Sequence, residues 1–108
     1  MFDHARTEWE QAGYTIAEHT QSPAVARGLL DAIVIHYPGH NGVNDNTAAS
    51  LANSQRYYCD QRGYSLGYNA VVDRAGELWQ VRGLDYQNAA NLGANPSTVS
   101  VQICIGIQ

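Results

Sequence analysis

The spacing of apolar and polar residues predicts several β-strands and helices along this chain. The clearest two-residue alternation lies near its end, over 97–107. There Val99, Val101, Ile103 and Ile105 alternate with small or polar side chains. This period is that of a strand whose two faces differ in polarity. We therefore predict a last strand over 97–107 with one well-buried face.

A strand–turn–strand unit is predicted over 68–81. Residues 68–72 are mostly apolar and end in two β-branched valines, while 77–81 alternate polar and apolar residues. Between them, residues 73–76 read Asp-Arg-Ala-Gly, a sequence typical of a turn. Gly63 and Gly67 precede the unit and let the chain turn from a helix into the sheet.

The segment 29–37 contains the longest run of apolar residues in this part of the chain. Ala-Ile-Val-Ile over 32–35 is uninterrupted, which is typical of a strand buried on both faces. The run ends at His36, and Pro38-Gly39 then turns the chain. Functional sites of α/β proteins lie just beyond the ends of such strands, which makes His36 a candidate site residue.

Helical spacing appears in two places. Residues 47–62 place Leu51, Gln55, Tyr58 and Cys59 on one stripe, with Asn46 or Thr47 as the N-cap and Gly63 as the stop. Residues 1–13 have apolar residues at helical spacing and predict a short amphipathic helix. Residues 14–18 are expected to form an edge strand.

Composition narrows the class of protein. The 108 residues are 44% hydrophobic and 15% charged, with a formal net charge of −4. One small domain over 1–108 is expected, with an N-terminal segment over 1–28 and a core over 29–108. No run of lysine or arginine supports a nucleic-acid partner, and no apolar stretch is long enough to predict a membrane span. Cys59 and Cys104 are expected to be free buried thiols.

Three stretches in order carry a resemblance to a known family: IVIHYPG over 33–39, GYSLGYNAVVDRAGELWQVRG over 63–83, and AANLGANPSTVSVQICI over 89–105. Together they resemble the type 2 amidase and peptidoglycan recognition protein family. The chain is most similar to the zinc-dependent N-acetylmuramoyl-L-alanine amidase domain of mycobacteriophage endolysins. This resemblance implies an α/β fold with a mixed central β-sheet and flanking helices.

The resemblance also implies roles for individual residues. His36 takes the position of the first zinc ligand, and a neutral imidazole is a favoured zinc donor. Tyr68 takes the position of the tyrosine whose hydroxyl helps to polarise the scissile carbonyl or to stabilise the oxyanion. The expected substrate contacts are Tyr37, His40, Asn69, Asn91 and Asn95.

Parts of the family pattern have no counterpart in this sequence. The family's second zinc ligand, counted back from Asn95, falls on Ala90, which cannot bind a metal. Its third ligand and a C-terminal helix lie beyond the last strand, whereas this sequence ends at Gln108. Three explanations stay open: the chain is part of a longer enzyme, it is a domain that binds without hydrolysing, or replacement ligands come from His40, Asp45 or Asp85.

Three functions follow from these observations as hypotheses. The first is a phage endolysin-type amidase that uses zinc, present in the host cytoplasm before lysis and then at the bacterial cell wall. The second is a non-catalytic peptidoglycan-binding module, and the third is a structural or interaction protein on the same scaffold. Because the family's C-terminal helix has no counterpart here, we also expect the sheet face near 97–107 to contact a second copy or another lysin domain.

Overall fold

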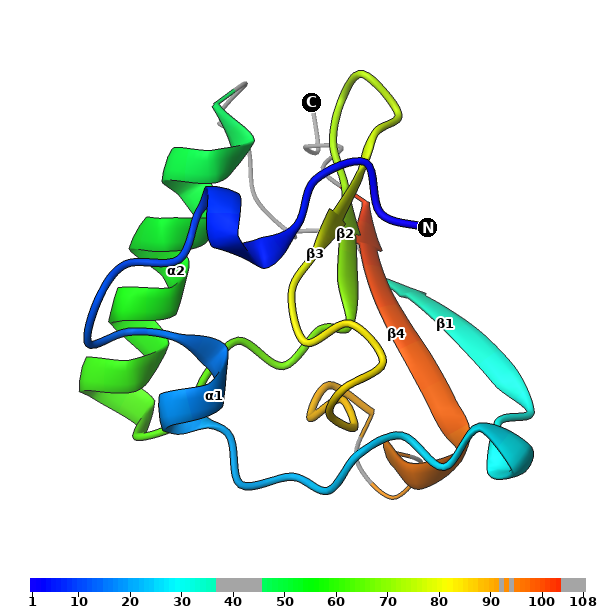
Figure 1. Ribbon diagram of the computed structural model, residues 1–108. Helices are drawn as coiled ribbons and strands as arrows, with labels where there is room; N and C mark the ends of the chain where they lie inside the picture. Colours follow the sequence, from blue (N-terminus) through cyan, green and yellow to red (C-terminus); the bar gives the residue numbers. More distant parts are fainter. Residues whose placement is uncertain (37–45, 92, 94, 104–108) are drawn as a thin grey trace.

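A computed structural model describes residues 1–36, 46–91, 93 and 95–103 of the chain (Figure 1). Its strands are β1 (Ala32–His36), β2 (Ala70–Val72), β3 (Leu78–Gln80) and β4 (Thr98–Ile103). Its α-helices are α1 (Ile16–His19) and α2 (Thr47–Arg62). Three short 3₁₀ turns complete the described elements: η1 (Arg6–Glu8), η2 (Arg27–Leu29) and η3 (Asn95–Ser97).

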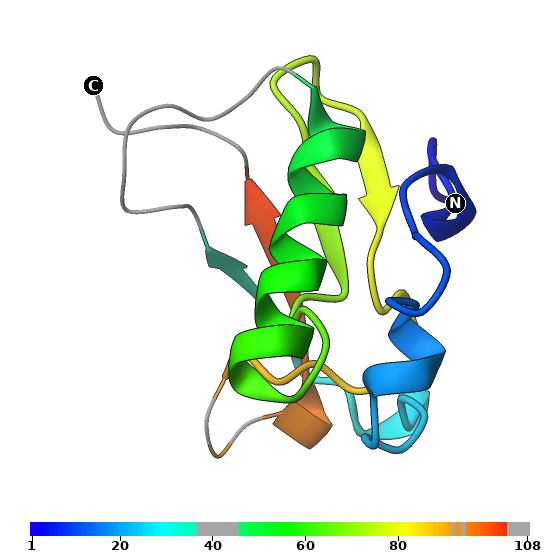
Figure 2. The ribbon, with the colours of Figure 1, turned by 90° about the vertical axis from the view of Figure 1, so that its left-hand side faces the viewer.

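The four strands form one mixed sheet in the order β1-β4-β2-β3. Strand β4 runs parallel to both β1 and β2, and β2 pairs with β3 as an antiparallel hairpin. The long helix α2 lies along one face of this sheet, as Figure 2 shows. The mixed central sheet with flanking helices is the fold class predicted from the sequence.

The predicted hairpin is confirmed, with strands shorter than expected. Asp73 organises its turn, since one carboxylate oxygen accepts the backbone N–H groups of Ala75 and Glu77, each at 2.9 Å. Gly76 closes the turn with φ of 84°, a left-handed conformation that favours glycine. The local sequence therefore determines this turn almost completely.

The predicted helix over 47–62 is also confirmed, with both of its ends. The side chain of Asn46 accepts the N–H of Ala49 at 3.0 Å, which caps the first turn. Gly63 follows the last turn with φ of 77°, and its N–H bonds to the carbonyl of Tyr58. The half-buried Cys59 thiol is free, and burial raises its pKa; Cys104 lies outside the described residues.

The core lies between α2, the sheet and the N-terminal segment. Its buried members are apolar side chains from all three parts: Trp9, Ile16, Leu51, Leu66, Val71, Trp79 and Val81. Gln55 of α2 is buried among them, accepts the N–H of Leu66 at 2.8 Å and donates to the carbonyl of Tyr14 at 3.0 Å. This amide fixes α2 to two loops at once. No helix within the described residues is long and apolar enough to cross a membrane.

The predicted N-terminal elements are wrong. Instead of a helix over 1–13, the chain forms only the 3₁₀ turn η1, because residues 3 and 4 pair with the edge of β3. Instead of an edge strand over 14–18, the chain forms α1. A capping box starts this helix, since the Thr15 hydroxyl accepts the Glu18 N–H and the Glu18 carboxylate accepts the Thr15 N–H.

Strand β1 is where predicted, but its predicted burial on both faces is wrong. It is an edge strand of the described sheet, and Ile33 and Ile35 are 68% and 52% exposed. They pair with Val99 and Val101 of β4, so these four side chains share one sheet face. A continuous apolar run cannot show by itself whether a second layer covers the strand.

Arg82 is a buried cation at the base of the hairpin, only 1% exposed. Its guanidinium donates to the carbonyls of Leu66, Ser65 and Gln87 at 2.7, 3.2 and 2.8 Å, and to the Ser22 hydroxyl at 3.1 Å. Burial lowers its pKa, yet a guanidinium stays charged at any ordinary pH. One side chain therefore holds three loops together.

We predict that Arg82→Met lowers the free energy of unfolding by at least about 2 kcal/mol, because two buried and two partly buried acceptors lose their donor. Urea denaturation followed by circular dichroism measures this change. Arg62→Met, at an exposed position near the end of α2, is the matched control and should change stability by less than about 0.5 kcal/mol. Equal stability of the two variants would contradict the bracing role of Arg82.

We also predict that the exposed face of β1 and β4 associates with a second copy or another domain. Ile33→Ser combined with Ile35→Ser should weaken self-association at least about tenfold, since two apolar side chains leave the contact. Sedimentation velocity over a range of concentrations measures it, with Leu29→Ser as a control for an exposed leucine outside the sheet. A wild-type chain that is monomeric at every concentration would refute association with a second copy.

Candidate functional site

The structure brings His36 and Tyr68 together. His36 is the last residue of β1, and Tyr68 lies just before β2. Their ring centroids are 5.4 Å apart with planes inclined at 60°, an attractive arrangement for aromatic rings. Burial raises the pKa of the Tyr68 hydroxyl, and the nearby Tyr58 adds to this shift. The hydroxyl therefore remains a protonated hydrogen-bond donor at neutral pH.

Asn91 completes this cluster from the loop between β3 and β4. The Nε2 atom of His36 lies 2.7 Å from the Oδ1 atom of Asn91. The amide nitrogen of Asn91 donates to the Thr98 hydroxyl at 3.0 Å. The side-chain amide of Asn88 donates to the same hydroxyl at 3.3 Å and to the Thr98 carbonyl at 3.0 Å. These bonds fix the amide of Asn91 with its oxygen toward His36.

This arrangement selects one tautomer of His36. Because Asn91 presents an acceptor, Nε2 of His36 carries the proton and Nδ1 keeps its lone pair. No partner for Nδ1 lies among the described residues. Within the described part of the chain, His36 thus offers one acceptor atom to a ligand, beside the hydroxyl of Tyr68.

Gly67 allows the loop that carries Asn91 to approach Tyr68. A Cβ atom at position 67 would lie 3.2 Å from the backbone carbon of Ala89, and the Ala89 N–H bonds to the Gly67 carbonyl at 2.9 Å. A side chain there would push the two loops apart. The glycine that the sequence assigns to a chain turn is therefore also needed for close packing.

The remaining predicted residues have other positions. The Asn69 side chain is buried and fully bonded, to the carbonyls of Gly83 and Tyr86 and to the N–H of Ser100. The Asn95 side chain accepts the N–H of Asn91 at 2.9 Å, which supports the loop. Tyr37, His40 and Asp45 lie outside the described residues, and Asp85 pairs with Arg6.

Two residues that sequence reasoning missed hold the site together, Asn88 and Thr98. The only signal for Asn88 was the richness of the 86–96 loop in asparagine, a residue that bonds readily to backbone groups, and Thr98 had none. The residue opposite His36 is Asn91, whereas counting along the sequence placed Ala90 there. A one-residue difference in a loop cannot be resolved by counting, because the loop conformation decides which side chain faces inward.

The donor set around His36 does not fit a catalytic zinc ion within the described residues. Such an ion takes three protein ligands, usually histidine, cysteine or carboxylate. His36 supplies one imidazole, while Asn91 supplies an amide oxygen and Tyr68 a protonated phenol. The one group of three metal-ligating side chains found among the described residues lies elsewhere and does not include His36.

Comparison with solved structures then decides the fold. The bumblebee protein PGRP-SA superposes with a TM-score of 0.74 over 94% of this chain, at 19% sequence identity. Human PGRP-IβC in complex with glycosamyl muramyl pentapeptide matches with a TM-score of 0.74 over 93% of this chain, at 17% identity. This chain has the peptidoglycan recognition protein fold.

A third solved structure with this fold is the endolysin LysCS from Clostridium intestinale, an N-acetylmuramoyl-L-alanine amidase. It matches with a TM-score of 0.58 at 17% identity over 95% of this chain. The chain spans 59% of the bumblebee protein, 58% of the human protein and 59% of the endolysin. No protein-family model and no curated protein matches the sequence. The structure therefore shares its fold with these three proteins although its sequence is less than 20% identical to theirs.

We predict that Asn91→Ala changes the tautomer of His36. Without the acceptor opposite Nε2, the Nε2–H tautomer loses about 1 kcal/mol of its stability relative to the Nδ1–H tautomer. The ratio of the two tautomers then shifts about fivefold toward Nδ1–H. Long-range ¹H–¹⁵N spectra of the imidazoles measure the tautomer ratio, with His19 as the internal reference. An unchanged ratio for His36 would show that Asn91 does not set its tautomer.

Proposed function

We propose that this chain is a peptidoglycan-directed domain that binds a muramyl peptide at the site of His36, Tyr68 and Asn91. The observation that carries the proposal is the meeting of His36 and Tyr68 beyond the end of β1, at 5.4 Å between ring centroids. The fold supports it, since solved proteins with this fold include complexes with a glycosamyl muramyl pentapeptide and with tracheal cytotoxin.

The chemistry of the site suits such a ligand. A muramyl peptide carries amide N–H groups, carbonyls and sugar hydroxyls, and it needs both acceptors and donors from the protein. His36 offers the lone pair of Nδ1, and Tyr68 offers a protonated hydroxyl and an apolar ring face. The loops behind them are held by buried hydrogen bonds, so the groups are positioned before the ligand arrives.

The donor set favours binding over hydrolysis. Among the described residues, only His36 of this site is a strong zinc ligand, and Asn91 occupies the place directly opposite its Nε2 atom. An amide oxygen binds zinc weakly compared with imidazole or thiolate. Binding of cell-wall fragments without turnover is therefore the function we propose first.

Hydrolysis of the N-acetylmuramoyl-L-alanine amide is the second candidate, as in a phage endolysin that acts first in the host cytoplasm and then on the cell wall. The position of Tyr68 favours it, because a neutral phenol beside His36 could stabilise a developing oxyanion. The further zinc ligands would have to come from residues outside the described ones. The likeness in fold to the endolysin LysCS, an N-acetylmuramoyl-L-alanine amidase, supports this candidate.

Calorimetric titration with a soluble muramyl pentapeptide tests the proposal. We expect His36→Ala to weaken binding at least about tenfold and Tyr68→Phe about threefold or more, since each loses contacts to the ligand. Tyr57→Phe, on an exposed tyrosine of α2, is the matched control and should leave the affinity unchanged. Full affinity in both site variants would overturn the proposal.

Incubation with insoluble cell walls separates the two candidates. Mass spectrometry of the soluble products, with and without added zinc, detects cleavage between muramic acid and L-alanine. Co-sedimentation with walls and no released peptide supports binding alone. Zinc-dependent release that is lost in His36→Ala supports the amidase. If the chain neither co-sediments with the walls nor releases peptide, both candidate functions are contradicted.

A further inference from the structure

The N-terminal segment is held against the hairpin by its backbone. The N–H groups of Asp3 and His4 bond to the carbonyl of Leu78 at 2.9 and 3.1 Å, and the N–H of Gln80 bonds to the carbonyl of His4 at 2.9 Å. The His4 ring stacks on Trp79 with centroids 3.9 Å apart and an interplanar angle of 18°. The imidazole of His4 therefore has a fixed position beside the start of β3.

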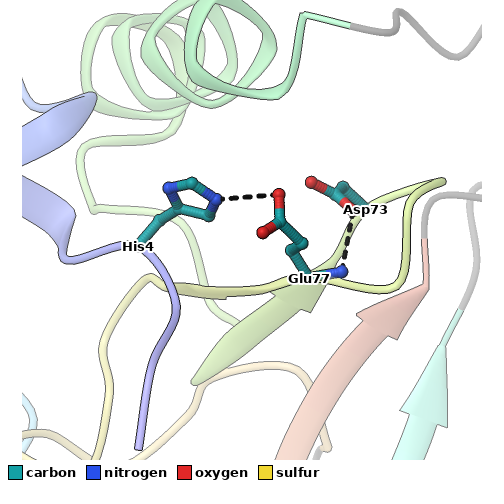
Figure 3. A group of neighbouring side chains, drawn as sticks. All are labelled: His4, Asp73 and Glu77. Carbon is teal, nitrogen blue, oxygen red and sulfur yellow. Dashed lines mark hydrogen bonds and ion pairs between the residues drawn. The ribbon is translucent and has the colours of Figure 1, made fainter.

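Two carboxylates of the hairpin converge on this imidazole (Figure 3). One ligand atom each from His4, Asp73 and Glu77 lies within 4.8 Å of the others. The Nε2 atom of His4 and an oxygen of Glu77 are 3.2 Å apart. Two donors bound tetrahedrally to zinc at about 2.0–2.1 Å are separated by about 3.3 Å, so this pair already has the spacing of a metal site.

The groups behind these donors are arranged as metal sites require. Glu8 accepts from Nδ1 of His4 at 3.0 Å, which leaves Nε2 as the atom that faces Glu77. A carboxylate on the far nitrogen is the usual second layer around a metal-binding histidine. Asp73 is oriented in turn by the indole N–H of Trp79 at 2.9 Å and by the backbone of its own turn.

Charge and space also favour a cation. Three carboxylates, from Glu8, Asp73 and Glu77, surround one imidazole, so the group keeps an excess of negative charge even when His4 is protonated. The donors border a cavity of about 630 Å³ that is widely open to solvent. Its described lining contains no lysine or arginine: His4, Asn46, Thr47, Ala48, Asp73, Ala75, Glu77 and Trp79.

We propose that His4, Asp73 and Glu77 bind a divalent transition-metal cation of the zinc class. The imidazole nitrogen selects such metals over Mg²⁺ and Ca²⁺, which prefer an all-oxygen set. Water in the adjoining cavity completes the coordination. Because His4 belongs to the N-terminal segment and the two carboxylates to the hairpin, the bound metal joins parts of the chain about 70 residues apart and stabilises the fold. This site shares no residue with the cluster around His36.

Calorimetric titration of the whole chain with ZnCl₂, after treatment with a chelator, tests the proposal. Wild type and His36→Gln are expected to bind one zinc ion with equal affinity, and zinc is expected to raise their melting temperature. His4→Gln and Glu77→Gln should each bind at least about tenfold more weakly, and Glu8→Gln about tenfold more weakly through loss of the orienting carboxylate. His19→Gln is the matched control, since its imidazole lies in the same segment, bonds to the carbonyl of Gly13 and stacks on Tyr14, away from this group of carboxylates.

Several outcomes would contradict the proposed zinc site. Full-strength zinc binding by His4→Gln and Glu77→Gln would do so, as would loss of binding in His36→Gln alone, which would place the metal at the other histidine. No binding by wild type at millimolar zinc would show that His4 is simply an ion-paired imidazole. Glu77→Gln changes a half-exposed surface side chain, so it keeps the test decisive if His4→Gln fails to fold. ¹H–¹⁵N spectra then report whether the His4 nitrogens shift on addition of zinc to wild type.

Discussion

The guanidinium of Arg82 holds together the loops on which the rest of this structure depends. It bonds to the carbonyls of Ser65 and Leu66, just before Tyr68, and to the carbonyl of Gln87, just before the loop that carries Asn91. A buried cation with only neutral partners is stable when its donors are satisfied by well-placed carbonyls. The position of the candidate site therefore depends on a residue that does not belong to it.

Other buried polar side chains also hold loops in place around the site. Asn69 joins the start of β2 to β4 and to the loop after β3, and Asn88 bonds to the first residue of β4. Each of them satisfies backbone groups of loops that no helix or strand could pair. Among the described residues, the hydroxyl of Ser100 is the one buried polar side-chain atom without a hydrogen-bond partner. A loop held in this way presents its side chains in one conformation, which lowers the entropic cost of binding a ligand.

Two histidines of this chain illustrate how surroundings decide chemistry. His36 faces an amide oxygen and an aromatic ring, so one nitrogen carries the proton and the other keeps a lone pair. His4 faces carboxylates on both of its nitrogens, which raises its pKa mainly through the hydrogen bond with Glu8 and next through that with Glu77. The first environment leaves an acceptor for a polar hydrogen-bonding group, and the second suits a cation.

The sequence by itself determined the elements whose signals are local. The turn at Asp73 and Gly76, the helix with Asn46 and Gly63 at its ends, and the strand that ends at His36 all follow from residues within a few positions of one another. The pairing of His36 with Tyr68 was expected only through the family resemblance.

Tertiary structure alone decided the rest. Residues 3 and 4 pair with β3 and no α-helix forms over 1–13, because backbone bonds and burial of Trp9 outweigh weak helical spacing. Strand β1 is exposed because burial depends on which layers cover a strand. Asn91 instead of Ala90 faces His36 because a loop's conformation is set by contacts such as those with Asn95 and Thr98. Patterns along a chain encode periods and turns, whereas the meeting of residues far apart depends on the packing of the whole molecule.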